Sequence, residues 1–491
     1  MSPRRMMFMA LFFAAAPLVW GAEPRAAKDD ATGKVPISTK SAPAKQAYLQ
    51  GRDLLEHLKN EEAHQAFARA AMADREFGMA VYGLALSAPD QAGFRAALQK
   101  ASELVRAGKM SEGEKHMIGG VEAGFSSQAA MALQHLTTLV RDYPDDERAH
   151  TLLGGLYLSL HQWQLGIDEF RKAIAINPEP PPPYAKLALA LRMQEKYDEA
   201  EQAAKKYIEL IPNNTKPVTS YADLLMKAGR FADSIAQYEK ALKLDGKLVD
   251  AFVGIANDQI FMGKPQEARN TLTKLESVAT NVDDRHQAHF WKAVSFLHEE
   301  KTQPALDEVQ RMYDLARRDS NRAAMAGDLN LMGAIRLELG QADAALAKYN
   351  EGLAIIDSSD LPSATKDTVH RNSLYDVARV KLVKKDLIGA EADAKKYREG
   401  VAVEKLQAEV CRSHELDGLV ALAKGDATTA VRELEQANML DPRALFALGE
   451  AYAAAGNAAA AKTAFTHAAN FNSPELGYAF VRAKAQAKLT K

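Results

Sequence analysis

A run of prolines lies in the stretch INPEPPPPYAKLA, residues 176–188, and its interpretation decides the fold. Five of the six residues from 178 to 183 are proline. Such a run is typical of a stiff polyproline II linker between two domains. It also fits a turn inside one continuous array of helices, because proline is tolerated in the first turn of a helix. The spacing of the residues on either side distinguishes the two.

A period of 34 residues passes through the proline run without interruption. Pro144, Pro178 and Pro212 follow this step, and Gly246 and Thr280 continue it. At 12 and 24 residues before each of these positions the residue is always Gly, Ala or Ser, and at 5 before it is always apolar. Two antiparallel helices and two turns fill such a period, with small residues where the helices cross. The prolines therefore predict a turn between repeats, and a domain boundary is excluded there.

The residues of these units resemble the tetratricopeptide repeat. LLGGLYLSLHQWQLGIDEFRKAIAINP, residues 152–178, supplies the Leu-Gly, Tyr, Phe, Ala and Pro positions of that motif, and residues 447–469 and 49–71 supply most of them again. The resemblance implies an all-α fold. We expect an α-solenoid in which about twelve helix-turn-helix repeats form a right-handed superhelix, elongated rather than spherical.

The two ends of the chain differ from the repeats. Arg4 and Arg5 precede an apolar stretch at residues 6–20, so residues 1–22 are predicted to be a secretory signal peptide, with an uncleaved anchor as the alternative. Residues 23–43 have little apolar content and predict a disordered linker. The rest divides into an N-terminal superhelix, residues 44–282, and a C-terminal one, residues 283–491, because the repeat spacing stretches after residue 282.

A single helix is predicted to cap the last repeat. It would begin after Ser473 as N-cap with Pro474 in its first turn. Its expected apolar face comprises Leu476, Phe480, Ala483 and Ala487. Such a helix covers the stacking surface of the final repeat and makes it soluble.

The composition limits the classes of partner. Lys and Arg number 62 against 64 Asp and Glu, so nothing indicates a nucleic-acid-binding surface. Cys411 is the only cysteine, and an exported chain of this kind has no internal disulfide. After removal of the signal peptide we expect no membrane-spanning segment, and the sequence indicates no particular oligomeric state.

The inner wall of the superhelix is the predicted binding surface. The resemblance implies that the first helix of each repeat lines a concave face where ligands bind, and here its inward positions are more apolar than a solvated face requires. Ordinary core packing is the alternative for any single one of them. The predicted partner-binding residues are Met117, Val121, Leu158, Leu189, Arg192, Met193, Met226, Val253, Asn257, Ile260 and Phe261.

Two groups of residues were weighed as catalytic or metal sites. Cys411 and His414 lie within one helical turn and would suit a nucleophile and its base, but nothing near them resembles an oxyanion hole. His286 and His289 follow two aspartates and would suit a metal patch, yet exposed histidines at an acidic helix start are the favoured interpretation. No motif of a known enzyme class is present, and no catalytic, cofactor or metal residue is predicted.

The sequence therefore predicts a non-catalytic scaffold or adaptor that binds peptides or helices of other proteins and needs no cofactor. The predicted signal peptide places it in the periplasm or outside the cell, and similar envelope proteins suggest a secretion or assembly system. The alternatives are a periplasmic holdase for exported chains and, from another class, a hydrolase that uses Cys411 and His414.

Overall fold

The computed structural model describes residues 33–126, 128–404 and 407–490. The predicted signal peptide and residues 23–32 of the predicted linker lie outside these ranges. The described residues form twenty-five α-helices and no strand. The helices are α1 (Ala42–Glu56), α2 (Asn60–Ala73), α3 (Gly78–Leu86), α4 (Gln91–Arg106), α5 (Glu112–Phe125), α6 (Ala129–Asp142), α7 (Glu147–Ser159), α8 (Trp163–Ile176), α9 (Pro181–Met193), α10 (Tyr197–Leu210), α11 (Thr215–Lys227), α12 (Phe231–Leu244), α13 (Val249–Phe261), α14 (Pro265–Val278), α15 (Val282–Leu297), α16 (Thr302–Arg318), α17 (Arg322–Glu338), α18 (Ala342–Asp357), α19 (Ser363–Val383), α20 (Leu387–Glu404), α21 (Gln407–Ala423), α22 (Ala427–Leu434), α23 (Pro442–Ala454), α24 (Ala458–Ala469) and α25 (Leu476–Leu489).

The helices pack as twelve successive hairpins followed by one single helix. Each odd-numbered helix from α1 to α23 packs most closely against the even-numbered helix that follows it, and α25 packs against α23 and α24. From α5 to α15, each odd-numbered helix also contacts the next odd-numbered one, so these helices share one face of the array. The predicted all-α solenoid of about twelve repeats is confirmed.

The proline run lies between two hairpins, as its register predicts. Helix α8 ends at Ile176 and α9 begins at Pro181, with Pro180 as its N-cap. The missing amide hydrogens of prolines in a first turn leave no intrahelical bond unmade, so the run starts a helix at no cost. The chain continues through it without a linker.

Small residues lie where the two helices of a hairpin cross. A Cβ atom placed on Gly154 in α7 would lie 2.6 Å from the ring of Phe170 in α8. One placed on Gly166 would lie 3.2 Å from the carbonyl oxygen of Gly154. The backbones therefore approach closely at both positions, which confirms the prediction made from the repeat.

Residues 33–41 form an ordered strap rather than part of a disordered linker. Val35 is buried, and its amide donates to an oxygen of Asp146 at 3.0 Å. The Ser38 amide donates to Glu114 at 3.0 Å. The strap thus supplies donors to carboxylates at or near the starts of two inner helices. The expected linker is ordered here because Val35 joins the hydrophobic core of the first repeats.

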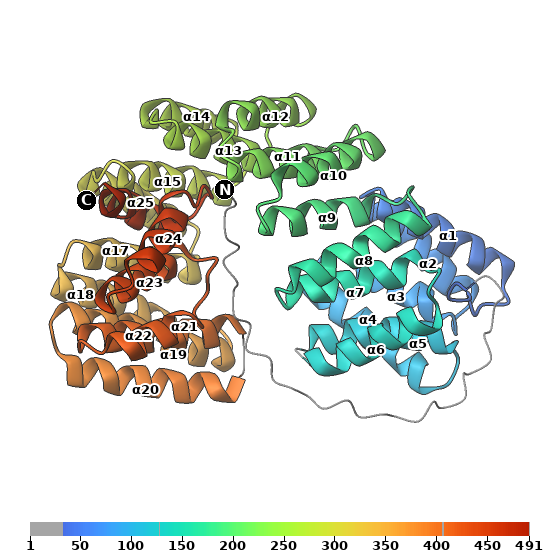
Figure 1. Ribbon diagram of the computed structural model, residues 1–491. Coiled ribbons are helices and arrows are strands. Elements are labelled where there is room, and N and C mark those ends of the chain that lie inside the picture. The colour runs from blue at the N-terminus through green and yellow to red at the C-terminus, as the bar shows by residue number, and fades with distance from the viewer. Residues whose placement is uncertain (1–32, 127, 405–406, 491) are drawn as a thin grey trace, which may run out of the picture.

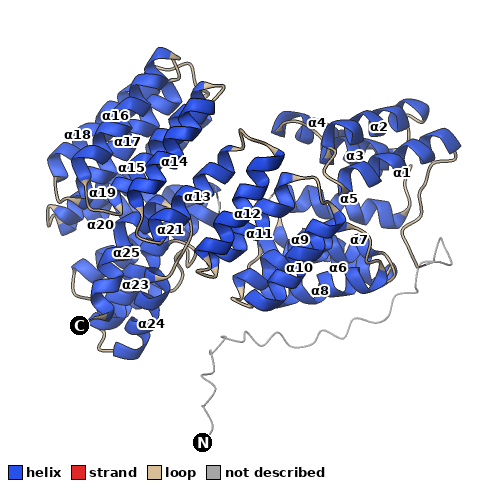
Figure 2. Ribbon diagram, turned by 90° about the horizontal axis from the view of Figure 1, so that it is seen from above, coloured by secondary structure: helices blue, strands red, loops and turns tan. Residues whose placement is uncertain are grey.

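The described residues form an arch in Figure 1, and Figure 2 shows its two ends from above with α11, α12 and α13 between them. Helices α1–α9 make one end, α10–α14 cross the top and α15–α25 make the other end (Figure 1). One hydrophobic cluster runs from Val218 to Ile335 and also takes in residues from Leu445 to Ala485. This cluster continues across residues 282 and 283, where two superhelices were expected to meet.

The last helix differs from the predicted cap. It begins at Leu476 with Glu475 as N-cap, so Ser473 and Pro474 lie outside it. Ala483 and Ala487 are exposed, whereas Tyr478 and Ala485 are fully buried. The buried face is displaced from the predicted one because α25 packs against α15 as well as against its own neighbours α23 and α24.

Candidate functional site

The predicted inner wall is closed along its middle part. Met226, Val253, Asn257, Ile260 and Phe261 are all less than 9% exposed, and the four apolar ones belong to the large cluster around α13. The Asn257 amide donates to the Val253 carbonyl of its own helix at 2.9 Å. These five residues lie in the core, where an open wall was expected, because the inner helices pack against one another and against the C-terminal segment.

The remaining predicted residues are distributed differently. Val121, Leu158, Arg192 and Met193 are half-buried, and Leu189 is 40% exposed. Met117 is buried and lines a pocket among the first five inner helices. Of the eleven predicted residues, Met117 alone contributes to this pocket, within the part of the chain that the structure describes.

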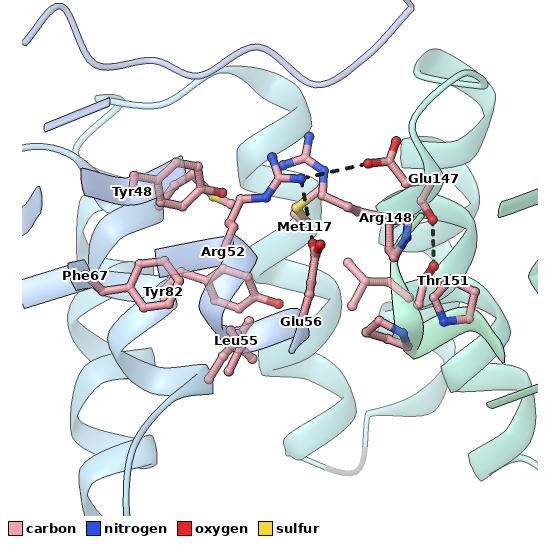
Figure 3. Close-up of a pocket in the computed structure, with 17 residues that line it drawn as sticks. Tyr48, Arg52, Leu55, Glu56, Phe67, Tyr82, Met117, Glu147, Arg148 and Thr151 are labelled. Atoms are coloured by element: carbon pink, nitrogen blue, oxygen red, sulfur yellow. Dashed lines mark hydrogen bonds and ion pairs between the residues drawn. The ribbon is translucent and has the colours of Figure 1, made fainter. Parts of the chain in front are cut away.

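The pocket has a volume of about 200 Å³ and is lined almost entirely by odd-numbered helices (Figure 3). Most of its surface is apolar. That volume suits a large side chain with part of its backbone rather than a whole domain. The lining residues are Tyr48, Arg52, Leu55, Glu56, Phe67, Met79, Tyr82, Gly83, Leu86, Met117, Glu147, Arg148, Thr151, Leu152, Pro180, Pro182 and Pro183.

Two opposite charges on α1 stand in this apolar lining. Glu56 and Arg52 are one helical turn apart, and the Arg52 guanidinium lies 3.8 Å from both Glu56 and Glu147. Burial raises the pKa of Glu56, and the Arg52 charge only partly offsets that effect. At 3.8 Å these ion pairs are looser than hydrogen-bonded ones, so both charges keep donor or acceptor capacity for a partner.

Tyr82 and Phe67 form the inner part of the pocket, with Tyr82 drawn between Phe67 and Glu56 in Figure 3. The Phe67 ring lies against Gly51 and Gly83, where added Cβ atoms would come within 2.7 and 2.4 Å of it. The Tyr82 hydroxyl is buried and has no hydrogen-bond partner among the described residues. An unsatisfied buried hydroxyl costs about 1–3 kcal/mol, and such groups in a native fold call for an explanation.

A third set of contacts holds the far side of the pocket rigid. Arg148 donates to Asp146 at 2.9 Å through Nε, and Asp146 also accepts from the Val35 amide. Burial would raise the pKa of Asp146, but the hydrogen bonds from Arg148 and Val35 hold it below its ordinary value. Lys34 of the strap binds Glu147 at 2.9 Å. The strap therefore fixes the first turn of α7, which lines the pocket.

Sequence reasoning missed most of this pocket. The unit around Gly83 is blurred in the sequence, so the inward position of Tyr82 was not recognised. The proline run was interpreted only as a turn, whereas Pro180, Pro182 and Pro183 also line the pocket. The pair Arg52 and Glu56, four residues apart on an inner helix, could have predicted the pocket. Burying charged side chains in a concave apolar face is costly, so their presence there indicates a polar role.

The residues weighed as catalytic or metal sites have other partners. A carboxylate oxygen of Glu433 lies 2.9 Å from His414 Nδ1, and Cys411 Sγ accepts from the Gln407 amide at 3.5 Å. His286 lies 2.9 Å from Asp328. Each histidine here is paired with a carboxylate of a neighbouring helix.

His289 is buried, contrary to the expectation of an exposed side chain, and lies 2.7 Å from Glu308. Among the described residues, no three His, Cys, Asp or Glu side chains gather as a metal site would require. No helix within the described ranges combines the length and apolar composition needed to cross a membrane.

Solved structures similar to this chain include several repeat proteins. MamA is 17% identical, and the match covers 34% of this chain and 91% of MamA with a TM-score of 0.32. YrrB, described as a TPR protein with an unusual peptide-binding site, is 15% identical over 37% of this chain and 91% of YrrB, with a TM-score of 0.28. A tetratricopeptide repeat protein from Parabacteroides merdae is 12% identical over 59% of this chain and 99% of its own, with a TM-score of 0.34.

A family model matches two adjacent units of the array. The tetratricopeptide repeat model matches residues 181–214 and 219–248. These ranges cover the hairpins α9–α10 and α11–α12, the first of which begins within the proline run. Residues 181–214 and 219–248 therefore match tetratricopeptide repeats, and the other described hairpins continue the same stacked arrangement on both sides of them.

Proposed function

We propose that this protein is a non-catalytic scaffold of the bacterial cell envelope that captures a segment of a partner protein in the pocket lined by α1, α3, α5, α7 and α9. Repeats of this family support protein–protein interaction in general. The observation that carries the specific proposal is the apolar pocket of about 200 Å³ with Arg52 and Glu56 in its lining.

The chemistry of the pocket favours a segment with one large apolar side chain. The apolar side chain would displace water from Leu55, Met79 and Leu86, which favours binding by about 25 cal/mol per Å² of apolar surface. Arg52 would donate hydrogen bonds to backbone carbonyls or acidic neighbours of that side chain, and the Glu56 carboxylate would accept them from backbone amides or basic neighbours. Such a division between apolar area and a few polar groups is usual for specific pockets.

Two exposed leucines on inner helices test where the partner binds. Leu86 lines the pocket and is 42% exposed, and Leu189 lies outside the pocket at 40% exposed. Each aspartate substitution should cost about 1–2 kcal/mol, and a similar amount in both variants, because the two leucines are equally exposed and both lie in helices. We expect Leu86→Asp to weaken partner capture at least tenfold and Leu189→Asp to change it less than twofold.

Capture is measured by crosslinking in the envelope and quantifying the co-purified chains for each variant. Loss of capture with Leu189→Asp but not with Leu86→Asp would move the binding surface to the wall predicted from the sequence. Capture of many unrelated unfolded chains by the wild type, undiminished by Leu86→Asp, would favour a holdase instead.

The envelope location rests on Arg4, Arg5 and the apolar stretch at residues 6–20. We expect the mature N-terminus, read by protein sequencing, to follow residue 21 or 22. Recovery of the full-length chain in the cytoplasm would contradict this part of the proposal.

A further inference from the structure

The C-terminal helix reaches back to the middle of the array. Arg482 in α25 donates to the carbonyl oxygen of Phe261 at 3.0 Å, although the two residues are 221 positions apart. Lys484 in the same helix lies 2.9 Å from Glu338, the last residue of α17. The stacking of repeats does not require these contacts, because each stacked repeat touches only the repeats next to it in the chain.

Aromatic rings fill the centre of this contact. The Tyr478 ring lies with its centroid 5.4 Å from that of Phe261, 5.7 Å from His298 and 5.9 Å from Phe471. The first two pairs are edge-to-face, the arrangement that ring quadrupoles favour. The Arg482 guanidinium lies over both the Phe261 and Tyr478 rings.

A lysine of α11 holds the segment that leads into α25. Lys227 donates to the carbonyl of Phe471 and its ammonium lies 3.8 Å from the centroid of that ring. Burial, together with the smaller effect of the Arg192 charge, lowers the pKa of Lys227 to about 8. A half-buried cation is tolerated here because the Phe471 carbonyl and ring face it directly.

All four attachment points lie at the C-terminal ends of successive inner helices. Lys227, Phe261 and Glu338 are the last residues of α11, α13 and α17, and His298 is the C-cap of α15. The carbonyl groups of the last turn carry partial negative charge and lack intrahelical donors. We call the surface formed by these four helix ends the helix-end groove.

The helix-end groove and α25 make complementary polar contacts. Arg482 satisfies a free carbonyl at the end of α13, and Lys484 pairs with the carboxylate at the end of α17. Tyr478 and Arg482, four residues apart, present a ring and a cation on one face of α25. Amphipathic helices bind grooves through side chains spaced at i, i+3, i+4 and i+7, and Tyr478 and Arg482 have this spacing.

We propose that the helix-end groove is a binding site for a basic aromatic helix, which α25 occupies as an internal ligand and a partner helix of the same chemistry displaces. The connecting residues 470–475 are not helical, and the Tyr478 hydroxyl donates to the carbonyl of Ala469 at the end of α24 at 2.7 Å, so release of α25 must break this bond as well as the groove contacts. A tethered helix competes at an effective concentration in the millimolar range, so the partner gains access only when α25 is weakened or outcompeted. This site is separate from the pocket near α1.

The test uses a fluorescent peptide of residues 473–490 added to the full chain. The wild type should bind it weakly, because α25 fills the groove. Arg482→Glu removes the groove contacts of α25 and should raise the affinity for the peptide at least tenfold. Gln486→Glu is the matched control, since Gln486 is exposed on the same helix, and it should leave peptide binding at the wild-type level.

Two further measurements test whether α25 can leave the helix-end groove. Adding Phe261→Ala to Arg482→Glu should remove most of the gained affinity, because Phe261 is the aromatic wall of the groove. In the wild type, the backbone amides of α25 should exchange with solvent faster than those of α13 and α15. Two results would show that α25 is a permanent part of the fold and not a displaceable ligand. One is a folded Arg482→Glu variant that binds the peptide no better than the wild type does. The other is amide exchange of α13, α15 and α25 at the same rate.

Discussion

A buried carboxyl group in α13, that of Asp258, lowers the stability of the folded protein. Asp258 is fully buried, and neither of its oxygens has a hydrogen-bond partner among the described residues. The neighbouring Ser234 hydroxyl donates to the Ala222 carbonyl instead. Burial raises the pKa of Asp258 to about 8, and the like charge of Asp223 adds to this effect. The group is therefore largely protonated at neutral pH.

Replacement of Asp258 by Asn should stabilise the protein above neutral pH. The folded-state pKa lies above the unfolded one, so the wild type loses stability as pH rises from about 4 to about 8. Asn removes this loss and should gain about 2 kcal/mol or more at pH 8 and little at pH 4. Denaturant unfolding at both pH values measures the difference.

Asp250→Asn is the control, because Asp250 lies exposed in the first turn of the same helix. It should cost under about 1 kcal/mol, since only a helix-dipole interaction is lost. If the difference in unfolding free energy between Asp258→Asn and the wild type is the same at pH 8 as at pH 4, Asp258 does not titrate as described.

At the scale of the element, a glycine and a large side chain sixteen residues later recur in the hairpins. The pairs are Gly51–Phe67, Gly120–Leu136, Gly154–Phe170, Gly333–Tyr349, Gly418–Leu434 and Gly449–Phe465, and a Cβ on each glycine would lie 2.7 Å or less from its partner. Each large side chain fills the space that the absent Cβ leaves. At Gly120 and Gly154 this complementarity was predictable, because both follow the 34-residue period.

Two adjacent glycines of α7 test this packing. Gly154→Ala should destabilise the protein by about 1–2 kcal/mol, because its Cβ would lie 2.6 Å from the buried ring of Phe170. Gly155→Ala should be neutral or stabilising by up to about 1 kcal/mol, since only Lys186 Nζ lies near, at 3.7 Å, and alanine favours helix. Thermal unfolding of the two variants measures the difference. Equal melting temperatures would show that the close approach of α7 and α8 does not require a glycine at position 154.

At the scale of the whole molecule, local periodicity predicted the hairpins but not how distant hairpins meet. The position of Phe261 in its repeat indicates an inward side chain, and nothing in its neighbourhood indicates that Arg482 caps its carbonyl. The same holds for the pocket, where α1 lies opposite the start of α9. Such contacts depend on the curvature summed over many repeats, to which each repeat contributes a small rotation.

Because α25 contacts the end of α13, a change in α13 should alter the stability of α25. Phe261→Ala should increase amide exchange in α25 at least tenfold, because Tyr478 and Arg482 both contact Phe261. Phe67→Ala removes a ring of the same size, buried in the separate cluster of the first repeats, and should leave α25 unchanged. Exchange followed by mass spectrometry compares the two; an equal response of α25 to both variants would argue against a specific contact.

The prolines at 180, 182 and 183 give the pocket near α1 a wall with unusual thermodynamic properties. A proline ring has no rotamers to lose, and its backbone φ is already restricted. A partner that binds against this wall therefore immobilises fewer torsion angles than one that binds against flexible side chains. Each immobilised flexible side chain costs about 0.5–1.5 kcal/mol of binding free energy. Binding calorimetry should therefore show a smaller entropic penalty in this protein than in a variant with these three prolines replaced by lysine or glutamine.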